Sequence, residues 1–201
     1  MQRHDDPAAD PLERFGALLA AAEAVGPERL PEPTAFCLAT VGPDGQPSAR
    51  MLLLKAADDR GFVFYTNMRS RKGRELAANP RAALCFHWQP LERQVRVEGL
   101  VEPVSDAEAD AYFQTRSRLR QLGAWASEQS EVIPAGDSLE ARVAAATARF
   151  EGRAVARPPH WSGFRLLPSA YEFWMNVEGR LHVRHRYTRT ERGWNVDTLF
   201  P

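Results

Sequence analysis

Apolar residues recur at three- and four-residue spacing near the start of the chain, at Leu12, Phe15, Leu18, Leu19 and Ala22. This spacing places them on one face of a helix, so the pattern predicts an amphipathic helix over residues 11–25. The residues before it are mostly polar or acidic, and we expect residues 1–10 to form a disordered arm.

Further along, apolar residues alternate or cluster over short runs that turn residues separate. These runs predict strands at residues 35–41, 48–56, 62–67, 81–88, 93–104, 161–167, 171–177, 180–189 and 193–200. Short turns that contain Asp and Gly join several of them, which is typical of antiparallel hairpins. Helices are predicted at residues 70–80, 105–128 and 137–150, the first two with Ser70 and Ser105 as N-caps.

This order of elements predicts an α+β fold in which an antiparallel sheet closes, or nearly closes, into a barrel with flanking helices. Residues 11–201 are expected to form a single domain. The chain contains no GxGxxG or P-loop motif. A nucleotide would therefore be held by side chains and strand backbone.

Composition and charge argue against several classes of function. Hydrophobic residues make up 44% of the chain, and Lys+Arg and Asp+Glu both count 26, a balance untypical of a general binder of nucleic acid or membrane surfaces. No apolar stretch approaches a membrane span, and the polar N-terminus does not resemble a signal peptide, so we expect a cytoplasmic location. Cys37 and Cys85 lie in apolar runs and are expected to be buried thiols. No metal-binding spacing is found, and no metal is expected.

Four cationic residues stand where a bound anion would explain them. Arg50 and Lys55 bracket the apolar run RMLLLK, and strand alternation would place them on opposite faces. Arg71 and Lys72 lie at the start of a predicted helix, where unpaired N–H groups and a positive dipole favour an anion. Together they suit a phosphate, although solvated surface charge is an equally good interpretation of Arg71 and Lys72 alone.

Two further groups could also hold an anion. Arg180, His182 and Arg184 would share one face of the predicted strand 180–189 and would repel one another without an anion. An edge strand protected by charge is an equal alternative. Tyr112 and Arg116 lie one helical turn apart and could clamp a phosphate, but by themselves they are better explained as a surface pair.

The chain also contains, in this order, the motifs ARMLLLK (49–55), FVFYTN (62–67), SRKGREL (70–76), NPRAAL (79–84), LERQVRVEG (91–99), YFQTR (112–116), GAWASEQS (123–130), WSGFR (161–165), EFW (172–174), RLHVR (180–184) and the terminal LFP. Over about residues 35–201 they closely resemble the pyridoxamine 5′-phosphate oxidase family. The resemblance implies an FMN-binding split barrel and a homodimer with active sites shared between subunits. It also implies a C-terminal dimerisation and active-site segment at about residues 160–201.

By position, the resemblance implies two sets of binding residues. The cofactor FMN would be held by Arg50, Met51, Leu52, Leu53, Leu54, Lys55, Tyr65, Thr66, Arg71, Lys72, Gln94, Gln129, Ser130, Trp174 and Arg184, with Gln129 and Ser130 reaching it from the partner subunit. The substrate would be held by Lys55, Tyr112, Arg116, Arg120, Arg180 and His182, of which Arg180 and His182 would flank its pyridine ring as the catalytic residues.

The implied reaction converts pyridoxine 5′-phosphate or pyridoxamine 5′-phosphate to pyridoxal 5′-phosphate by hydride transfer to the flavin, which O2 then reoxidises with release of hydrogen peroxide. One alternative is a paralogous FMN oxidase of secondary metabolism, similar to the phenazine-biosynthesis members. Another is a non-catalytic protein that binds flavin or pyridoxal phosphate. Retention of Lys55, Tyr112 and Arg116 favours the vitamin B6 interpretation.

Three positions depart from the usual pattern of the family. Arg120 stands where a serine is usual, Met175-Asn176 where Gln-Gly is usual, and Val183 where an acidic residue is usual. Arg120 could bind phosphate, favour a carboxylate, point to solvent or pair with an acidic residue such as Glu128. Val183 would remove a charge that could balance the neighbouring arginines.

Overall fold

Nine strands form one sheet in the computed structural model, which describes residues 6–201, and every pair of neighbouring strands is antiparallel. They are β1 (Ala35–Val41), β2 (Pro47–Leu53), β3 (Ala56–Asp58), β4 (Gly61–Asn67), β5 (Arg81–Trp88), β6 (Arg93–Pro103), β7 (Trp161–Met175), β8 (Val183–Thr190) and β9 (Gly193–Leu199). Their order is β2-β1-β5-β6-β7-β4-β3, and β8 and β9 extend the sheet from β7. The predicted α+β class and antiparallel sheet are confirmed.

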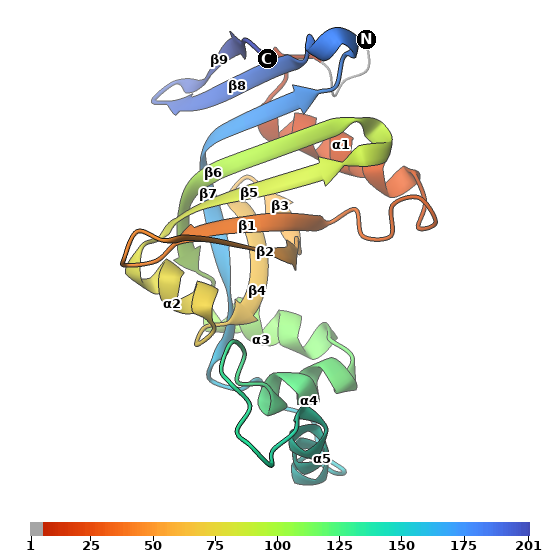
Figure 1. Cartoon of the computed structure of the whole chain (residues 1–201), viewed down its shortest axis with the longest axis vertical. Coiled ribbons are helices and arrows are strands. Elements are labelled where there is room, and N and C mark those ends of the chain that lie inside the picture. The colour runs from red at the N-terminus through yellow and green to blue at the C-terminus, as the bar shows by residue number, and fades with distance from the viewer. Residues whose placement is uncertain (1–5) are drawn as a thin grey trace.

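The long strand β7 gives the sheet its curl because its two ends have different neighbours. Its first part, up to Leu166, pairs with β4, and its last part, from Ala170, pairs with β8, while β6 pairs along most of its length. Figure 1 shows β7 running from the end of the molecule that carries α4 and α5 to the end that carries β8 and β9. The sheet is a split barrel whose edge strands are β2 and β3 at the two ends of this order and β9 at the end of the β8–β9 extension.

Helix α1 (Pro11–Ala24) covers the core of the sheet, as its apolar spacing predicts. Phe15 is fully buried, and its ring lies 4.8 Å from that of Phe62 and 5.0 Å from that of Phe86. Residues 6–10, part of the expected arm, form a turn that leads into the helix, and the Tyr187 hydroxyl donates a hydrogen bond to the Pro7 carbonyl. Residues 1–5 lie outside the described part of the chain.

The remaining helices lie on the side of the sheet away from β8 and β9 (Figure 1). They are α2 (Arg71–Ala78), α3 (Asp106–Thr115), α4 (Arg118–Ala126) and α5 (Leu139–Arg149). Ser70 and Ser105 cap α2 and α3 as expected, each accepting a hydrogen bond from a backbone N–H three residues later. Within residues 6–201, no helix has the length and apolar character needed to cross a membrane.

Several predicted boundaries were wrong. The helix predicted at 105–128 is two helices, because the chain turns at Arg116 and Ser117 between α3 and α4. The strands predicted at 161–167 and 171–177 are the single strand β7, which accommodates Pro168 where the register with β6 shifts. The run 48–56 divides into β2 and β3, which lie at opposite edges of the sheet.

Two predictions about side-chain placement also need correction. Strand β8 begins only at Val183, and Arg180 lies before it in a short 3₁₀ turn, Glu178–Arg180, so Arg180 does not share a strand face with Arg184. Cys37 and Cys85 are half-buried rather than buried, and they are register partners on β1 and β5.

Candidate active site

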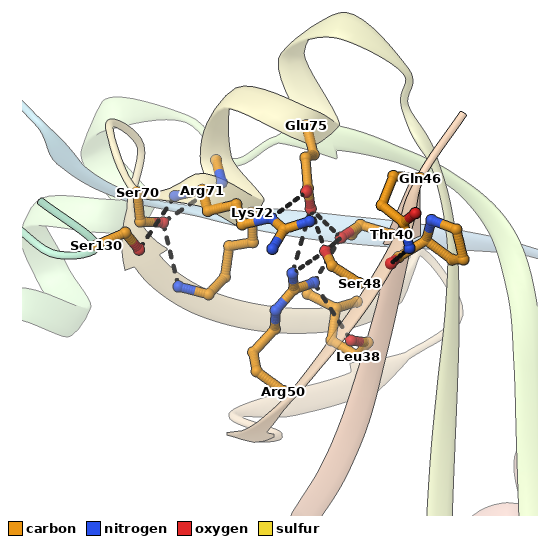
Figure 2. Close-up of polar contacts among 12 residues, drawn as sticks. Leu38, Thr40, Gln46, Ser48, Arg50, Ser70, Arg71, Lys72, Glu75 and Ser130 are labelled. Carbon is orange, nitrogen blue, oxygen red and sulfur yellow. Dashed lines mark hydrogen bonds and ion pairs between the residues drawn. The ribbon is translucent and has the colours of Figure 1, made fainter. Parts of the chain in front are cut away.

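A buried carboxylate organises the cationic residues around the start of α2 (Figure 2). Glu75 accepts hydrogen bonds from the guanidinium groups of Arg50, at 3.2 Å, and Arg71, at 2.8 Å. The hydroxyls of Thr40 and Ser48 donate to the same carboxylate at 2.5 and 2.6 Å. Burial alone would raise the pKa of the Glu75 carboxyl, but its two hydroxyl and two guanidinium partners outweigh burial and lower it to about 2.

Lys72 is a buried ammonium whose bonded partners are all neutral. Its Nζ donates to the Thr66 hydroxyl at 3.2 Å, the Ser70 hydroxyl at 3.1 Å and the Gln129 side-chain oxygen at 3.0 Å. Burial, and then the charge of Arg50, lower the pKa of Lys72 to about 8, against the opposing effect of Glu75. A cation desolvated in this way is stabilised by an incoming anion.

Gln129 and Ser130 reach this cluster from the loop after α4 of the same chain. Gln129 accepts from Lys72, and the Ser130 hydroxyl accepts from the backbone N–H of Arg71 at 3.2 Å. The expectation that these two residues come from a partner subunit is therefore wrong for the contacts with Arg71 and Lys72. The loop from α4 folds back over the start of α2, which brings together residues that are distant in sequence.

A cavity of about 330 Å³ opens beside Lys72 and extends to α3 and α4. Among the residues that line it, the sequence predicts Leu52, Tyr65, Thr66, Arg116, Arg120 and Gln129. Thr66 and Gln129 are also partners of Lys72, so the cation cluster lies at one end of the cavity. The predicted cofactor and substrate residues thus meet in one space.

Stacked aromatic rings form one wall of this cavity. The Tyr65 ring stacks on Tyr112 with the ring centroids 4.0 Å apart, and on Trp161 at 5.3 Å. The Arg116 guanidinium lies 4.6 Å from the centre of the Trp161 ring. Burial raises the pKa of the Tyr65 phenol to about 12, so it stays protonated at neutral pH. Trp161 belongs to the WSGFR motif, but the sequence predicts no role for it.

A second group of cations surrounds the other end of the cavity. Burial lowers the pKa of Lys55, Glu32 opposes this effect, and the nearby charges of Arg120 and Arg116 lower the pKa further. The Nη1 atom of Arg116 is buried and has no hydrogen-bond partner within the described residues. Lys55 follows the end of β2, and its charge interacts with those of Arg116 and Arg120. The chain turns at Arg116 and Ser117, so Tyr112 and Arg120 lie on different helices, α3 and α4.

No carboxylate of residues 6–201 pairs with Arg120, and Glu128 instead pairs with Arg142 at 3.0 Å. One of the alternatives for Arg120, an ion pair with Glu128, is therefore not formed. Arg120 is exposed and lines the cavity, so its guanidinium can meet a ligand there.

Four further predicted site residues lie at the opposite end of the molecule: Gln94, Trp174, His182 and Arg184. Gln94, Trp174 and Arg184 are successive partners across β6, β7 and β8, so they share one face of the sheet. The His182 ring lies 4.7 Å from that of Trp174, and its Nδ1 accepts from the Val177 backbone N–H at 3.3 Å. Figure 1 places β8 far from α4, and none of these residues lines the cavity described above. A single chain therefore carries two separate halves of the predicted site.

Comparison with known proteins identifies the family. Residues 27–150 match the family model described as pyridoxamine 5′-phosphate oxidase. Residues 161–201 match the model described as the C-terminal dimerisation region of pyridoxine 5′-phosphate oxidase. The chain belongs to the pyridoxamine 5′-phosphate oxidase family.

Relatives within this family are similar over nearly the whole chain. The pyridoxine/pyridoxamine 5′-phosphate oxidase of Myxococcus xanthus (strain DK1622) is 56% identical, over 96% of this chain and 92% of that protein. The enzyme of the same name from Gluconobacter oxydans is 53% identical, over 96% of this chain and 95% of that protein. The crystal structure of PhzG from Burkholderia lata 383, in complex with tetrahydrophenazine-1-carboxylic acid, has a TM-score of 0.91 and 35% identity, and the match covers 100% of this chain and 97% of that one.

The structure also accounts for two of the positions at which the chain departs from the family's usual pattern. Glu172 of the EFW motif is buried and binds Arg184 with both carboxylate oxygens, at 3.0 and 3.1 Å. It therefore supplies the negative charge that Val183 does not. The side chain of Asn176 donates to the Glu92 carboxylate at 3.2 Å, which ties the end of β7 to the turn before β6.

Proposed function

We propose that this chain is an FMN-dependent oxidase that converts pyridoxine 5′-phosphate or pyridoxamine 5′-phosphate to pyridoxal 5′-phosphate, with O2 as acceptor and hydrogen peroxide as second product. With pyridoxamine 5′-phosphate, one water is also consumed and the amine nitrogen leaves as ammonia. The proposal is supported by relatives of that name at 53–56% identity. One structural observation carries it. Two separate cation groups stand at the two ends of one aromatic-walled cavity, and the reaction brings together two phosphates, one on the cofactor and one on the substrate.

The cofactor phosphate fits the group at the start of α2. Arg71, Lys72 and the Ser130 hydroxyl supply donors there, and the desolvated ammonium of Lys72 gains from a dianion. Arg50 is held by Glu75, Thr40 and Ser48, so it contributes its positive charge to the site from β2. Bound FMN supplies the two-electron chemistry, which no side chain of the protein provides.

The substrate phosphate fits the group formed by Lys55, Tyr112, Arg116 and Arg120. The unpartnered Nη1 of Arg116 offers a hydrogen bond to a phosphate oxygen, and Tyr112 offers a phenol held by its stacking on Tyr65. Three cations here balance the charge of a phosphate dianion better than they balance a neutral vitamer. These residues bind and orient the substrate and exclude water from one side of it.

Catalysis further needs the residues on the face of the sheet that carries Gln94, Trp174 and Arg184. We propose that a second copy of the chain supplies this face. The chain carries the family's dimerisation region, and Gln94, Trp174, His182 and Arg184 lie far from the cavity of their own chain. In a two-fold dimer each cavity would be completed by this face of the partner, and Arg180 and His182 would then flank the substrate ring. The cytoplasmic location stays a prediction.

The test is a stoichiometric assay of the FMN-loaded protein in air. We expect pyridoxal 5′-phosphate and hydrogen peroxide to form in equal amounts from either B6 phosphate. A second candidate, an oxidase of the phenazine type, is favoured by the similarity to PhzG. Oxidation of reduced phenazine carboxylic acids, with neither B6 phosphate oxidised, would establish that candidate and contradict the proposal. A protein that binds FMN and oxidises neither class would be a non-catalytic binder.

A further inference from the structure

Glu75 is the buried carboxylate among the cations at the start of α2 (Figure 2). Its exposed fraction is 5%, and the side chains that bond to its carboxylate are all donors, from three elements, β1, β2 and α2. Four donors converge on its two oxygens, and a carboxylate can accept about four hydrogen bonds. A buried carboxylate is costly unless it is bonded in this way, so its place among phosphate-binding cations requires an explanation.

The geometry of the two arginines suggests what Glu75 does. Arg71 contacts Glu75 through Nε, and within residues 6–201 its two Nη atoms have no hydrogen-bond partner. The outer edge of the Arg71 guanidinium therefore remains available for two parallel bonds to a phosphate. Arg50 is fixed more completely, because its Nη atoms also donate to Thr40, at 2.5 Å, to Ser48, and to the Leu38 carbonyl at 3.3 Å.

The charge of the cluster gives a second reason for a carboxylate at this position. Arg50, Arg71 and Lys72 carry three positive charges within one helical turn and the strand beneath it, and Glu75 carries one negative charge. The group therefore has a net charge of about +2, which matches the charge of about −2 of a phosphate monoester at neutral pH. Without Glu75, three unbalanced cations would repel one another in the protein before any ligand binds.

We infer that Glu75 is a positioning residue for the cofactor phosphate: it orients Arg71, anchors Arg50 and adjusts the charge of the site to that of a phosphate monoester. This inference rests on the proposed function, because it assumes that the phosphate of FMN binds at the start of α2. Glu75 itself does not touch the ligand. It acts through the two guanidinium groups.

The test compares binding of FMN and of riboflavin, which lacks the phosphate, to apoprotein by quenching of flavin fluorescence. Glu75→Gln keeps the size of the side chain but removes its charge. We expect affinity for FMN to fall about 10- to 100-fold, as for the loss of one set of charge-assisted bonds, and affinity for riboflavin to change less than about twofold. The matched control is Glu131→Gln, which removes an exposed carboxylate that pairs with Arg74, the neighbour of Glu75 on α2. It should alter neither affinity.

The pH profile supplies an independent readout. The charged groups that face Lys72 are Arg50 from β2 and Glu75 from its own helix, and they act in opposite directions on its pKa. Loss of the Glu75 charge should therefore move the pH at which FMN affinity declines to a lower value. A side chain that only fills space would leave this pH unchanged.

The outcomes separate the two proposals. If the native protein prefers FMN over riboflavin and Glu75→Gln keeps that preference, the inference is overturned while the proposed function stands. Equal losses of both flavins, with a lower melting temperature, would show a purely structural role and overturn it too. A native protein without preference for FMN contradicts the proposed cofactor site itself. If Glu75→Gln fails to fold, Ser48→Ala takes its place, because it removes one donor to Glu75. This variant must lower the affinity for FMN about threefold and leave the affinity for riboflavin unchanged. If the two affinities do not differ in this way, the inference is overturned.

Discussion

At the scale of the residue, Arg120 is the one of the three departures from the family's usual pattern that lines the cavity. It is exposed, lines the cavity beside Arg116 and has no carboxylate partner within residues 6–201. Its charge adds to that of Arg116 in lowering the pKa of Lys55. A third cation at this end should favour a dianionic substrate and disfavour a neutral one.

We predict that Arg120→Ser reduces the preference for pyridoxine 5′-phosphate over unphosphorylated pyridoxine, measured as the ratio of their kcat/KM values, about tenfold. The estimate corresponds to one charge-assisted hydrogen bond of about 1.5 kcal/mol. Arg192→Ser, in the exposed turn between β8 and β9, removes the same charge at the far end of the molecule and should not change the ratio. An unchanged ratio in Arg120→Ser would show that Arg120 is not a phosphate ligand.

Lys72 gives the site a predicted pH dependence. Its pKa is lowered to about 8, so the free protein loses this positive charge as the pH rises through that value. A bound phosphate favours the charged form of Lys72, so FMN binding takes up a proton above pH 8. The Kd for FMN should therefore rise by up to about tenfold for each pH unit above that value. Riboflavin affinity should not follow this profile. A Lys72→Met variant should bind FMN weakly and without the decline near pH 8; persistence of the same decline would assign it to another group.

At the scale of the element, helix α2 is the part of the site that the sequence predicts best. Ser70 as N-cap and the two cations in the first turn are local signals, and the structure has them in those places. The buried partner Glu75 was missed, because its role depends on hydroxyls from β1 and β2 that are distant in sequence. Contacts of this kind leave no local pattern.

We predict that replacing Arg71 and Lys72 together by Ala weakens FMN binding at least about 100-fold, because two charge-assisted contacts with the phosphate are lost. The matched control is Arg69→Ala with Arg74→Ala. Arg69 precedes α2 and Arg74 lies on it, so this variant also removes two positive charges, but from outside the cluster around Glu75. Equilibrium dialysis against FMN measures both. Equal affinity of the two double variants for FMN would refute a phosphate site at the start of α2.

The errors in element boundaries have physical causes. Pro168 interrupts the apolar pattern and suggests two strands, yet β7 continues because Ser169 forms the extra residue of a bulge opposite Glu98 and Gly99. Gly99 permits this approach, since a Cβ there would lie 2.0 Å from the Leu167 carbonyl oxygen. Arg180 and Arg184 have the spacing of residues on one strand face, but Glu178–Arg180 form a turn, with Gly179 at positive φ, that removes Arg180 from the strand.

At the scale of the whole molecule, the separation of the two half-sites predicts that they function only across a dimer. Arg71 and Lys72 contact the loop after α4, while Trp174 lies in the part of β7 that pairs with β8; Figure 1 shows α4 and β8 at opposite ends of the molecule. Shared sites of this kind require an extensive interface, above the roughly 2,000 Å² typical of obligate pairs. Light scattering should find a dimer, and a monomer that still oxidises its substrate would contradict the arrangement.

A heterodimer tests the sharing directly. One subunit would carry Arg71→Ala with Lys72→Ala and the other Trp174→Ala, each inactive as a homodimer, and the mixed dimer would be purified by two different tags. In the mixed dimer, the native cavity of the Trp174→Ala subunit meets the native Trp174 of its partner, while the other site carries both defects. We therefore expect about half the native activity per dimer. A mixed dimer as inactive as both parents would mean that each site is built from one chain.

The central claim is that this protein oxidises B6 phosphates through a bound flavin, and the reductive half-reaction tests it most directly. FMN-loaded protein would be mixed without oxygen with one equivalent of pyridoxamine 5′-phosphate, and the visible absorption of the flavin would be followed. We predict loss of the oxidised flavin spectrum with formation of the aldehyde product, and recovery of the spectrum, with release of hydrogen peroxide, when air is admitted. A flavin that stays oxidised with both pyridoxamine 5′-phosphate and pyridoxine 5′-phosphate would contradict the account.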